Sequence, residues 1–326
     1  MRRFSFFAPM GWILLLVMIS TQLSGCVQHS SAEDDSYASY YARQEEEEQQ
    51  ELKGMADDLA VLGREDENTP GYQSDDYADL LINDSTNEVL RSYRCFEKNY
   101  PASLTKVMTA LLVLEHGNLD DEITLEHDIV LTEDGAVVST LSKGDTVSVD
   151  DVFHGLLIKS ANDCAVILAE YIAGSEEAFV DMMNQRAVEL GATHTHFANP
   201  HGLHEEDHYT TAYDLYLIFK EAVQYDTFVD VVSTKDYTMT YTTADGREVS
   251  EYMQSTNHYL LNEYPVPDGV TMFGGKTGTT SMARSCLMLM TENDEGERFF
   301  SVVMGAETQE DLYNSMTELL ENIVNN

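Results

Sequence analysis

Pro101-Ala102-Ser103-Leu104-Thr105-Lys106 leads directly into an apolar run, Val107 to Leu114, whose composition and length predict a helix. Ser103 and Lys106 are three positions apart. Residues at this spacing lie on one face of a helix, about one turn apart. We therefore expect the hydroxyl of Ser103 and the amine of Lys106 to touch.

This pair combines the residue types of a nucleophile and its base. An isolated hydroxyl is a poor nucleophile, and an adjacent base makes it a good one. A lysine amine can be that base only if its pKa falls well below the reference value of about 10.4, through burial or a neighbouring cation. The backbone N–H groups at the start of the helix can also stabilise an oxyanion. Taken alone, the spacing fits equally well an N-cap Ser103 with a solvated Lys106 one turn on.

Two further motifs favour the catalytic interpretation. Ser160-Ala161-Asn162 and Lys276-Thr277-Gly278 follow the first motif in this order along the chain. The set S-x-x-K, S-x-N or S-D-N, and K-T-G is typical of class A β-lactamases and penicillin-binding proteins. All three motifs fall on predicted elements, and the second is predicted to be a tight connection between two helices.

The N-terminus predicts export. Arg2 and Arg3 precede an apolar run, Trp12 to Ile19, that is too short to span a bilayer and fits the core of a signal peptide. Leu23-Ser24-Gly25-Cys26 resembles the lipobox of bacterial lipoproteins. We expect residues 1–25 to be a signal peptide and a lipid on Cys26 to anchor the protein to the outer face of the cell membrane. The alternative is an ordinary cleaved signal peptide with an incidental cysteine.

Charge excludes one large class of partner. The chain has 326 residues, 58 of them acidic and 18 basic, for a formal charge of −40. Binding of a phosphate backbone needs clusters of Lys and Arg, so we expect no nucleic acid partner. Residues 26–71, with four consecutive glutamates at 45–48, are too polar to form a core and are predicted to be a disordered tether. Leu52 to Leu62 allows a short helix within it.

The remaining residues, 72–326, predict one catalytic domain of the α/β (α+β) class. Its sheet is expected to be mainly antiparallel and flanked by helices, with a helical lobe in the middle of the chain. The predicted strands are 78–82, 89–96, 237–241, 247–252, one that Lys276 opens, 287–290 and 299–304. One predicted helix follows Ser103, and five more span 148–158, 163–173, 176–190, 211–223 and 309–324.

Three cysteines remain if Cys26 carries lipid, namely Cys95, Cys164 and Cys286. An odd number leaves at least one thiol free, and export permits a disulfide without requiring one.

Three histidines, His201, His204 and His208, raise the alternative of a zinc enzyme. Their spacing is H-x-x-H-x-x-x-H in a loop and differs from the H-E-x-x-H of a zinc-binding helix. We expect no metal and no cofactor.

The quoted motifs carry a family resemblance. The sequences at 101–106, 160–163, 201–203 and 276–279 resemble the serine D-Ala-D-Ala carboxypeptidases, the low-molecular-mass penicillin-binding proteins. The resemblance covers roughly residues 76–307. It implies the penicillin-recognising, β-lactamase/transpeptidase-like fold and removal of the terminal D-Ala from peptidoglycan stem peptides through an acyl-enzyme. It also implies β-lactam antibiotics as covalent inhibitors.

The same resemblance implies roles for the first two motifs. Ser103 is expected to be the nucleophile and Lys106 its base. Ser160 is expected to relay a proton to the leaving amine, and Asn162 to bind a substrate amide.

The third motif is expected to bind substrate. Lys276 adds positive charge that helps to keep Lys106 neutral and attracts the substrate carboxylate. Thr277, Gly278 and Thr279 continue this wall, and the resemblance implies an oxyanion hole from the backbone N–H groups of Ser103 and Thr279.

Two departures from the family pattern affect these expectations. Many relatives continue into a β-rich second domain and an amphipathic anchor helix, which we expect to be absent from this chain and replaced by the lipid. Many relatives also carry Arg where this chain has Thr256, and Gly where it has Arg284. We therefore expect Arg284 to supply or supplement the charge that meets the substrate carboxylate. The alternative for Arg284 is a solvated residue on an edge strand.

Rival functions remain open at this stage. A class A β-lactamase needs a further glutamate, for which the histidine-rich loop offers Glu205 and Glu206 without the expected spacing. A non-catalytic penicillin sensor would retain Ser103 and acylate once. The motifs do not distinguish carboxypeptidase from endopeptidase or transpeptidase, nor growth from sporulation, nor do they give the oligomeric state.

Overall fold

A computed structural model describes residues 60, 77–131, 133 and 136–325. Every described residue belongs to the compact unit Asp58–Asn326. The predicted signal peptide and Cys26 lie outside the described residues, as does all of the predicted tether except Ala60. No helix in the described ranges is both long enough and apolar enough to cross a bilayer.

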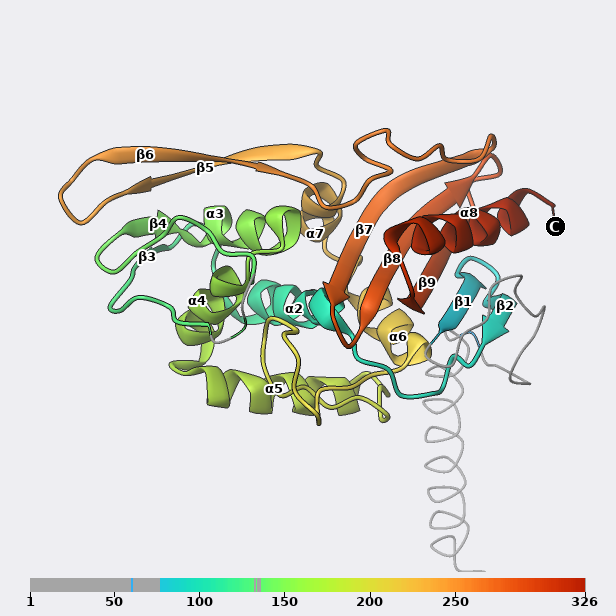
Figure 1. The fold of residues 1–326 in the computed structure, drawn as a ribbon, viewed down its shortest axis with the longest axis horizontal. Helices are drawn as coiled ribbons and strands as arrows, with labels where there is room; N and C mark the ends of the chain where they lie inside the picture. The colour runs from blue at the N-terminus through green and yellow to red at the C-terminus, as the bar shows by residue number, and fades with distance from the viewer. Residues whose placement is uncertain (1–59, 61–76, 132, 134–135, 326) are drawn as a thin grey trace, which may run out of the picture. The chain divides into compact units, whose positions relative to one another are not determined.

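An antiparallel five-stranded sheet forms the centre of the fold, in the order β2-β1-β9-β8-β7 (Figure 1). The last strand of the chain pairs with the first, with Ala78 opposite Met304. The mainly antiparallel sheet predicted from the sequence is therefore confirmed. Its strands are β1 (Ala78–Asn83), β2 (Glu88–Tyr93), β7 (Val270–Thr280), β8 (Arg284–Asn293) and β9 (Arg298–Ala306).

Alternation along β8 supplies both faces of this sheet with apolar side chains. Leu287 and Leu289 pack in the cluster beneath α8 (Gln309–Asn325), whereas Met288 packs in the main core with α2 (Lys106–His116) and α6 (Ala212–Ala222). Successive strand residues point to opposite faces, so a buried strand reads as a continuous apolar run.

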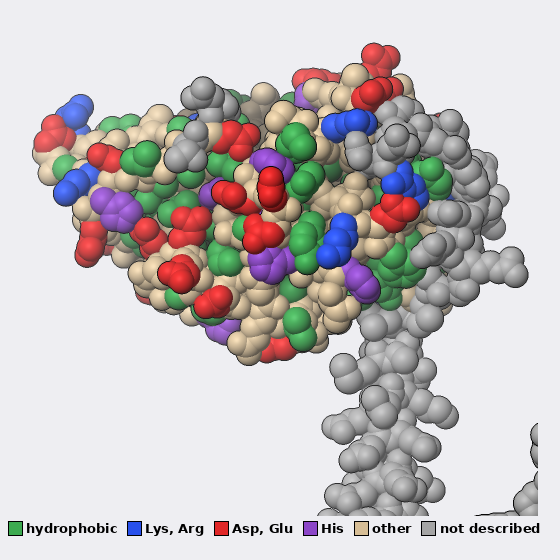
Figure 2. Space-filling model, turned by 60° about the horizontal axis from the view of Figure 1, so that its bottom comes forward, with side chains coloured by type: hydrophobic (Ala, Val, Ile, Leu, Met, Phe, Trp, Pro, Cys, Tyr) green, Lys and Arg blue, Asp and Glu red, His purple; other side chains and the backbone are tan. Residues whose placement is uncertain are grey.

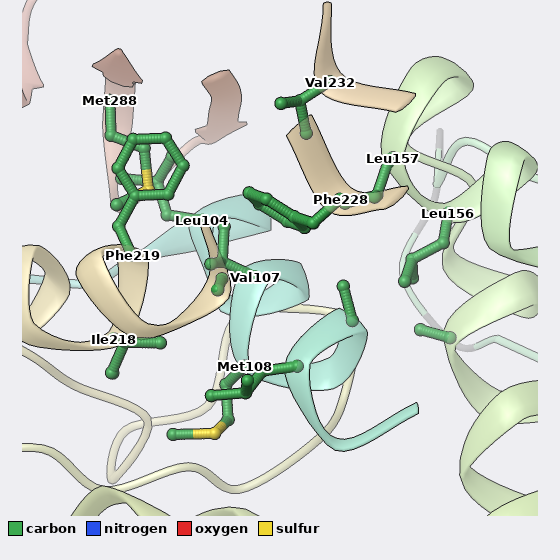
Figure 3. Packing of buried hydrophobic residues seen from close by; sticks show 14 of the residues in the cluster. Leu104, Val107, Met108, Leu156, Leu157, Ile218, Phe219, Phe228, Val232 and Met288 are labelled. Atoms are coloured by element: carbon green, nitrogen blue, oxygen red, sulfur yellow. The ribbon is translucent and has the colours of Figure 1, made fainter. Parts of the chain in front are cut away.

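The main core surrounds the helix that follows Ser103. Leu104 and Val107 are fully buried, and burying a side chain of this size stabilises the fold by about 1.5–3 kcal/mol. Figure 3 shows them among larger side chains from three other elements: Phe219, Phe228 and Met288. The start of α2 is therefore held firmly from several sides.

The predicted helical lobe is also present. The serine at 148 caps its first helix, because the Ser148 hydroxyl accepts a hydrogen bond from the backbone N–H of Asp151 at 3.0 Å. The helix continues as a π-turn, Gly155–Lys159, before the connection at Ser160. The lobe comprises α3 (Val149–His154), α4 (Asn162–Ala173) and α5 (Glu176–Glu189).

A second, four-stranded sheet lies over this lobe, in the order β3-β4-β5-β6 (Figure 1). The predicted strands 237–241 and 247–252 pair as a hairpin and are the third and fourth strands in this order. Two short strands between residues 122 and 148 form the other two. Its strands are β3 (Glu122–Thr124), β4 (Thr146–Ser148), β5 (Asp236–Thr242) and β6 (Glu248–Gln254).

The predicted start of the Lys276 strand is wrong. Strand β7 begins at Val270, and Gly274 and Gly275 lie inside it at a register shift. A Cβ at Gly274 would lie 2.3 Å from the carbonyl oxygen of Val232, and one at Gly275 would lie 1.9 Å from that of Met288. These glycines allow close backbone approach inside the strand, whereas the prediction that the strand opens at Lys276 leaves both of them outside it.

Two other features escaped the sequence analysis. Helix α7 (Asp226–Val232) is short and has no side-chain cap, so its sequence carries little signal. Ala60, which the tether prediction includes, is fully buried in the core, and its carbonyl oxygen accepts a hydrogen bond from the Tyr213 hydroxyl at 3.0 Å. Ala60 falls in the stretch Leu52 to Leu62, for which the sequence allowed a short helix within the tether.

The acidic composition is visible at the surface. On the face shown in Figure 2, Asp and Glu side chains are spread widely, whereas Lys and Arg occur at a few separate places. A face of this kind presents no basic stripe to a phosphate backbone.

Candidate active site

The first wall of the site is the short 3₁₀ turn Ala102–Thr105, which runs directly into α2. Ser103 lies on this turn, and Lys106 is the first residue of the helix. The Lys106 Nζ lies 2.8 Å from the Ser103 Oγ, so the predicted contact is present. A Cβ at Gly202 would lie 1.9 Å from the carbonyl oxygen of Ala102, so the loop after α5 packs tightly beneath the nucleophile turn.

Lys106 is enclosed on all sides. Its side chain has no exposed surface, and its Nζ also lies 2.8 Å from the Asn162 Oδ1 and 2.6 Å from the carbonyl oxygen of His201. Burial, followed by the nearby positive charge of Lys276, lowers the pKa of Lys106 well below its usual value. This is the direction that a lysine base requires.

The second wall is the connection between the π-turn and α4. Ser160 takes up a left-handed conformation, with φ of 61°, and Asn162 opens the next helix. The Asn162 side chain is fixed from two directions, because its Nδ2 donates to the carbonyl oxygen of Val137 at 3.0 Å while its Oδ1 faces Lys106. The predicted tight helix–helix connection is confirmed.

The third wall is the edge strand β7. Lys276 is buried and donates hydrogen bonds to the Ser160 Oγ and to the carbonyl oxygen of Thr277, both at 2.9 Å. Burial lowers the pKa of Lys276 to about 7. Gly278 lies so close to the nucleophile turn that a Cβ there would be 2.9 Å from the backbone nitrogen of Ser103. A glycine in the K-T-G motif therefore lets the strand approach Ser103.

The three walls enclose a cleft of about 370 Å³. It is lined by most of the predicted site residues, namely Ser103, Ser160, Asn162, Thr277, Gly278 and Thr279. Lys106 and Lys276 are buried behind its surface and bonded to Ser103 and Ser160.

Arg284 occupies a different position. It begins β8 opposite Thr280, as expected for neighbouring strands, and its backbone is left-handed, with φ of 57°. Thr280 and Ser285 line the cleft, whereas Arg284 is not among the described residues that line it. The structure therefore does not bring Arg284 together with the other predicted residues.

Two histidines of the predicted loop are hydrogen-bonded within the fold. The Nδ1 of His201 accepts from the backbone N–H of Leu203 at 3.1 Å, and burial followed by the charge of Lys106 lowers the pKa of His201 to about 3. The ring of His208 bonds to the backbone of Ala198 and to the Thr105 hydroxyl. Within the described part of the chain, no cluster of three metal-binding side chains occurs.

The cysteines Cys95, Cys164 and Cys286 are all buried and form no disulfide with one another. Cys164 lies on α4 beside the site, and burial raises the pKa of its thiol well above the usual value. A buried thiol of this kind is a small apolar side chain rather than a reactive group.

Some functional contacts escaped the sequence analysis. Asp163 was quoted only as part of a motif, yet its carboxylate accepts hydrogen bonds from the Ser139 backbone at 2.9 and 3.0 Å and fixes the loop beside Asn162. His258 and Gln309 line the cleft without belonging to any recognised motif. Asp163 and Ser139 are 24 positions apart and His258 and Gln309 are 51 apart, so these contacts leave no periodic signal from which to predict them.

Comparisons with known proteins agree with this geometry. A family model described as D-alanyl-D-alanine carboxypeptidase matches residues 65–308. D-alanyl-D-alanine carboxypeptidase DacF of Bacillus subtilis is 36% identical over 249 residues, which are 74% of this chain and 60% of that protein. DacC of Escherichia coli is 33% identical over 251 residues, 74% of this chain and 59% of that protein. The chain thus spans about three fifths of the length of these relatives.

Solved structures with a similar fold include a DD-transpeptidase and a penicillin-binding protein. The Streptomyces K15 DD-transpeptidase matches with a TM-score of 0.68 and 26% identity, over 76% of this chain and 96% of that one. Penicillin-binding protein D2 of Listeria monocytogenes, in its cefotaxime-bound form, matches with a TM-score of 0.63 and 28% identity, over 78% of this chain and 99% of that one.

Proposed function

Because this chain belongs to the D-alanyl-D-alanine carboxypeptidase family and has the fold of the penicillin-binding DD-peptidases, we propose that it is a serine D,D-carboxypeptidase. It removes the terminal D-Ala from peptidoglycan stem pentapeptides through an acyl-enzyme, and β-lactam antibiotics acylate it. One observation carries the proposal: Lys106 is fully buried, next to the cation Lys276, with its Nζ 2.8 Å from the Ser103 Oγ.

The contacts of Lys106 support its role as the base. A neutral amine has two hydrogens and one lone pair. The Asn162 Oδ1 and the His201 carbonyl oxygen can only accept, so they take the two hydrogens. The lone pair then faces the Ser103 hydroxyl, the one partner of the three that can donate. A neutral Lys106 is therefore oriented to receive the proton of Ser103.

The reaction begins when the Ser103 Oγ attacks the carbonyl carbon of the penultimate D-Ala and passes its proton to the Lys106 Nζ. The carbonyl oxygen becomes an oxyanion, which we propose is held by the backbone N–H groups of Ser103 and Thr279. The close approach of Gly278 to the nucleophile turn supports this oxyanion hole, because it brings the backbone of β7 next to the backbone of Ser103.

Release of D-Ala requires a proton at the leaving nitrogen. We propose that the Ser160 hydroxyl supplies it and is resupplied by Lys276, whose Nζ lies 2.9 Å away. With its pKa lowered to about 7, Lys276 gives up a proton more easily than an exposed lysine. Water then attacks the acyl carbon, and the Ser103 Oγ leaves with the proton that Lys106 holds. Of the two protons of the water, one restores Lys276 and the other passes to solvent, so Ser103 and both lysines regain their starting states.

The β-lactamase alternative has less support. Glu205 and Glu206, the candidates for activating a deacylating water, are not among the described residues that line the cleft. A carboxylate has to lie within hydrogen-bond reach of the water that it activates.

Anchoring by lipid is a further proposal, and it rests on the N-terminal sequence alone. We propose that Cys26 carries the lipid and holds the enzyme at the outer face of the cell membrane. Cys26→Ser should shift the protein from the membrane fraction to the soluble fraction. Retention of this variant in the membrane would contradict the proposal.

The reaction is tested by mass spectrometry of a stem pentapeptide incubated with the protein. Loss of one D-Ala in the wild type, and an intact peptide with Ser103→Ala, is the expected result. An intact peptide with both proteins would refute the proposed activity. A cross-linked peptide dimer serves as a second substrate, and cleavage at its cross-link in place of the terminal D-Ala bond would reassign the protein as an endopeptidase.

A further inference from the structure

Part of the cleft comes from residues outside the three motifs. Thr256 and His258 follow β6, and Gln309 is the first residue of α8. This region is joined to the K-T-G strand, because the hydroxyls of Thr256 and Thr277 lie 2.5 Å apart. Since side chains alternate along a strand, Thr279 presents its hydroxyl on the same side as Thr277.

His258 connects this region to a fixed chain of hydrogen bonds. Its Nδ1 lies 2.5 Å from a carboxylate oxygen of Glu263, and its Nε2 lies 2.6 Å from the side-chain nitrogen of Gln309. The ring also packs edge-on against Tyr313, with 5.3 Å between ring centroids. The amide nitrogen of Gln309 can only donate, so the Nε2 of His258 accepts and its Nδ1–H donates to Glu263.

This arrangement holds an otherwise exposed glutamine in one orientation. Gln309 is exposed on the helix, where a long side chain would sample many rotamers. Its amide group has two N–H donors, of which His258 takes one. The second N–H of the Gln309 amide is left to donate to a ligand in the cleft.

The substrate of the proposed reaction ends in a carboxylate that must be met on binding. A carboxylate that leaves water requires a cation or several hydrogen-bond donors. None of the described residues that line the cleft is Lys or Arg, and Arg284 lies outside the lining. Hydroxyl and amide groups must therefore donate many of the hydrogen bonds that bind the substrate carboxylate.

We propose that Gln309 is a specificity-determining residue that donates a hydrogen bond to the C-terminal carboxylate of the substrate peptide, beside the hydroxyls of Thr277 and Thr279. His258 and Glu263 are positioning residues that fix the Gln309 amide. This inference rests on the proposed carboxypeptidase function and adds the group that selects a free C-terminus. It assigns to Gln309 the role that the sequence analysis gave to Arg284.

The test compares two peptides that differ only at the C-terminus: one ends in D-Ala-D-Ala with a free carboxylate, the other in the C-terminal amide. The measured quantity is the ratio of kcat/KM for the acid to that for the amide. Gln309→Glu keeps the shape of the side chain and replaces its donors with a second carboxylate. The ratio should fall about tenfold or more, because a hydrogen bond to a charged group is lost.

Asn314→Asp is the matched control. It makes the same amide-to-carboxylate change at another exposed position of α8 that does not line the cleft, so it should leave the ratio unchanged. His258→Phe keeps the ring beside Tyr313 and removes both nitrogens. It should raise KM for the acid peptide severalfold with kcat unchanged, a split that a general loss of folding would not give.

The outcomes separate this inference from the proposed function. A wild type that cleaves neither peptide would remove the proposed function and this inference with it. A wild type that prefers the acid peptide, together with a Gln309→Glu variant that keeps this preference, would overturn the inference alone. An equal fall in Asn314→Asp, or a selective fall in Arg284→Gln without one in Gln309→Glu, would also overturn it.

Discussion

Replacing Gly278 with alanine tests how closely the K-T-G strand must approach the nucleophile. An alanine Cβ would lie 2.9 Å from the backbone nitrogen of Ser103, and 3.1 Å from both the Cβ of Ala102 and the backbone nitrogen of Leu104. Ordinary contact begins at 3.4 Å, so strand and turn must separate by about half an ångström. The contacting atoms are mainly backbone, which cannot rotate away.

This displacement should affect both stability and rate. Inserting one methyl group into a well-packed site costs about 1–3 kcal/mol. A misplacement of about 1 Å lowers the rate roughly a hundredfold, so a displacement of about half an ångström should lower it about tenfold. The assay is the rate of covalent labelling by a fluorescent penicillin, read alongside thermal unfolding.

Gly174→Ala provides the control. Its backbone has φ of +79°, so alanine is strained there by roughly 1–2 kcal/mol, but no described atom lies within 4 Å of the added methyl group. This variant should lose stability and label at the wild-type rate. If Gly278→Ala also labels at the wild-type rate, the close approach of β7 to Ser103 does not matter for acylation.

Three further predictions concern single groups. Lys106→Ala should keep the fold and abolish acylation of Ser103, and near wild-type labelling would place the base elsewhere. Lys276→Met should move the rising limb of the acylation pH profile to higher pH. Lys106 must be neutral to act, and removing a nearby cation raises the pKa of Lys106. A shift of the rising limb to lower pH would contradict this electrostatic explanation. Arg91→Met should destabilise the protein by about 3–5 kcal/mol in a denaturant titration, because it leaves the buried carboxylate of Asp79 without its partner at 2.8 Å, and an unchanged midpoint would contradict this.

The core of the site was predictable because its signals are local. Ser103 and Lys106 touch as their spacing along a helix requires, and Ser148 caps a helix whose end positions Ser160. Capping, helical periodicity and glycine at helix ends act over a few residues, so they can be identified in the sequence. The helical lobe and the connection at Ser160 followed from these signals.

The features that escaped prediction depend on distant parts of the chain. The backbone of Val232 leaves no room for a side chain at Gly274, and no local pattern reveals that neighbour. Ala60 is buried and bonded through its carbonyl oxygen to the hydroxyl of Tyr213, 153 positions away. The side chain of His258 contacts that of Gln309, which lies 51 positions further along the chain.

The central claim is that Ser103 is a nucleophile activated by Lys106, and the most direct measurement is peptide mapping after reaction with benzylpenicillin. Protein treated at neutral pH is digested, and the peptide carrying the added mass is sequenced by tandem mass spectrometry. We expect one adduct, on the oxygen of Ser103, in the wild type and none in Lys106→Ala. An adduct on any other residue, or an equally labelled Lys106→Ala variant, would contradict it.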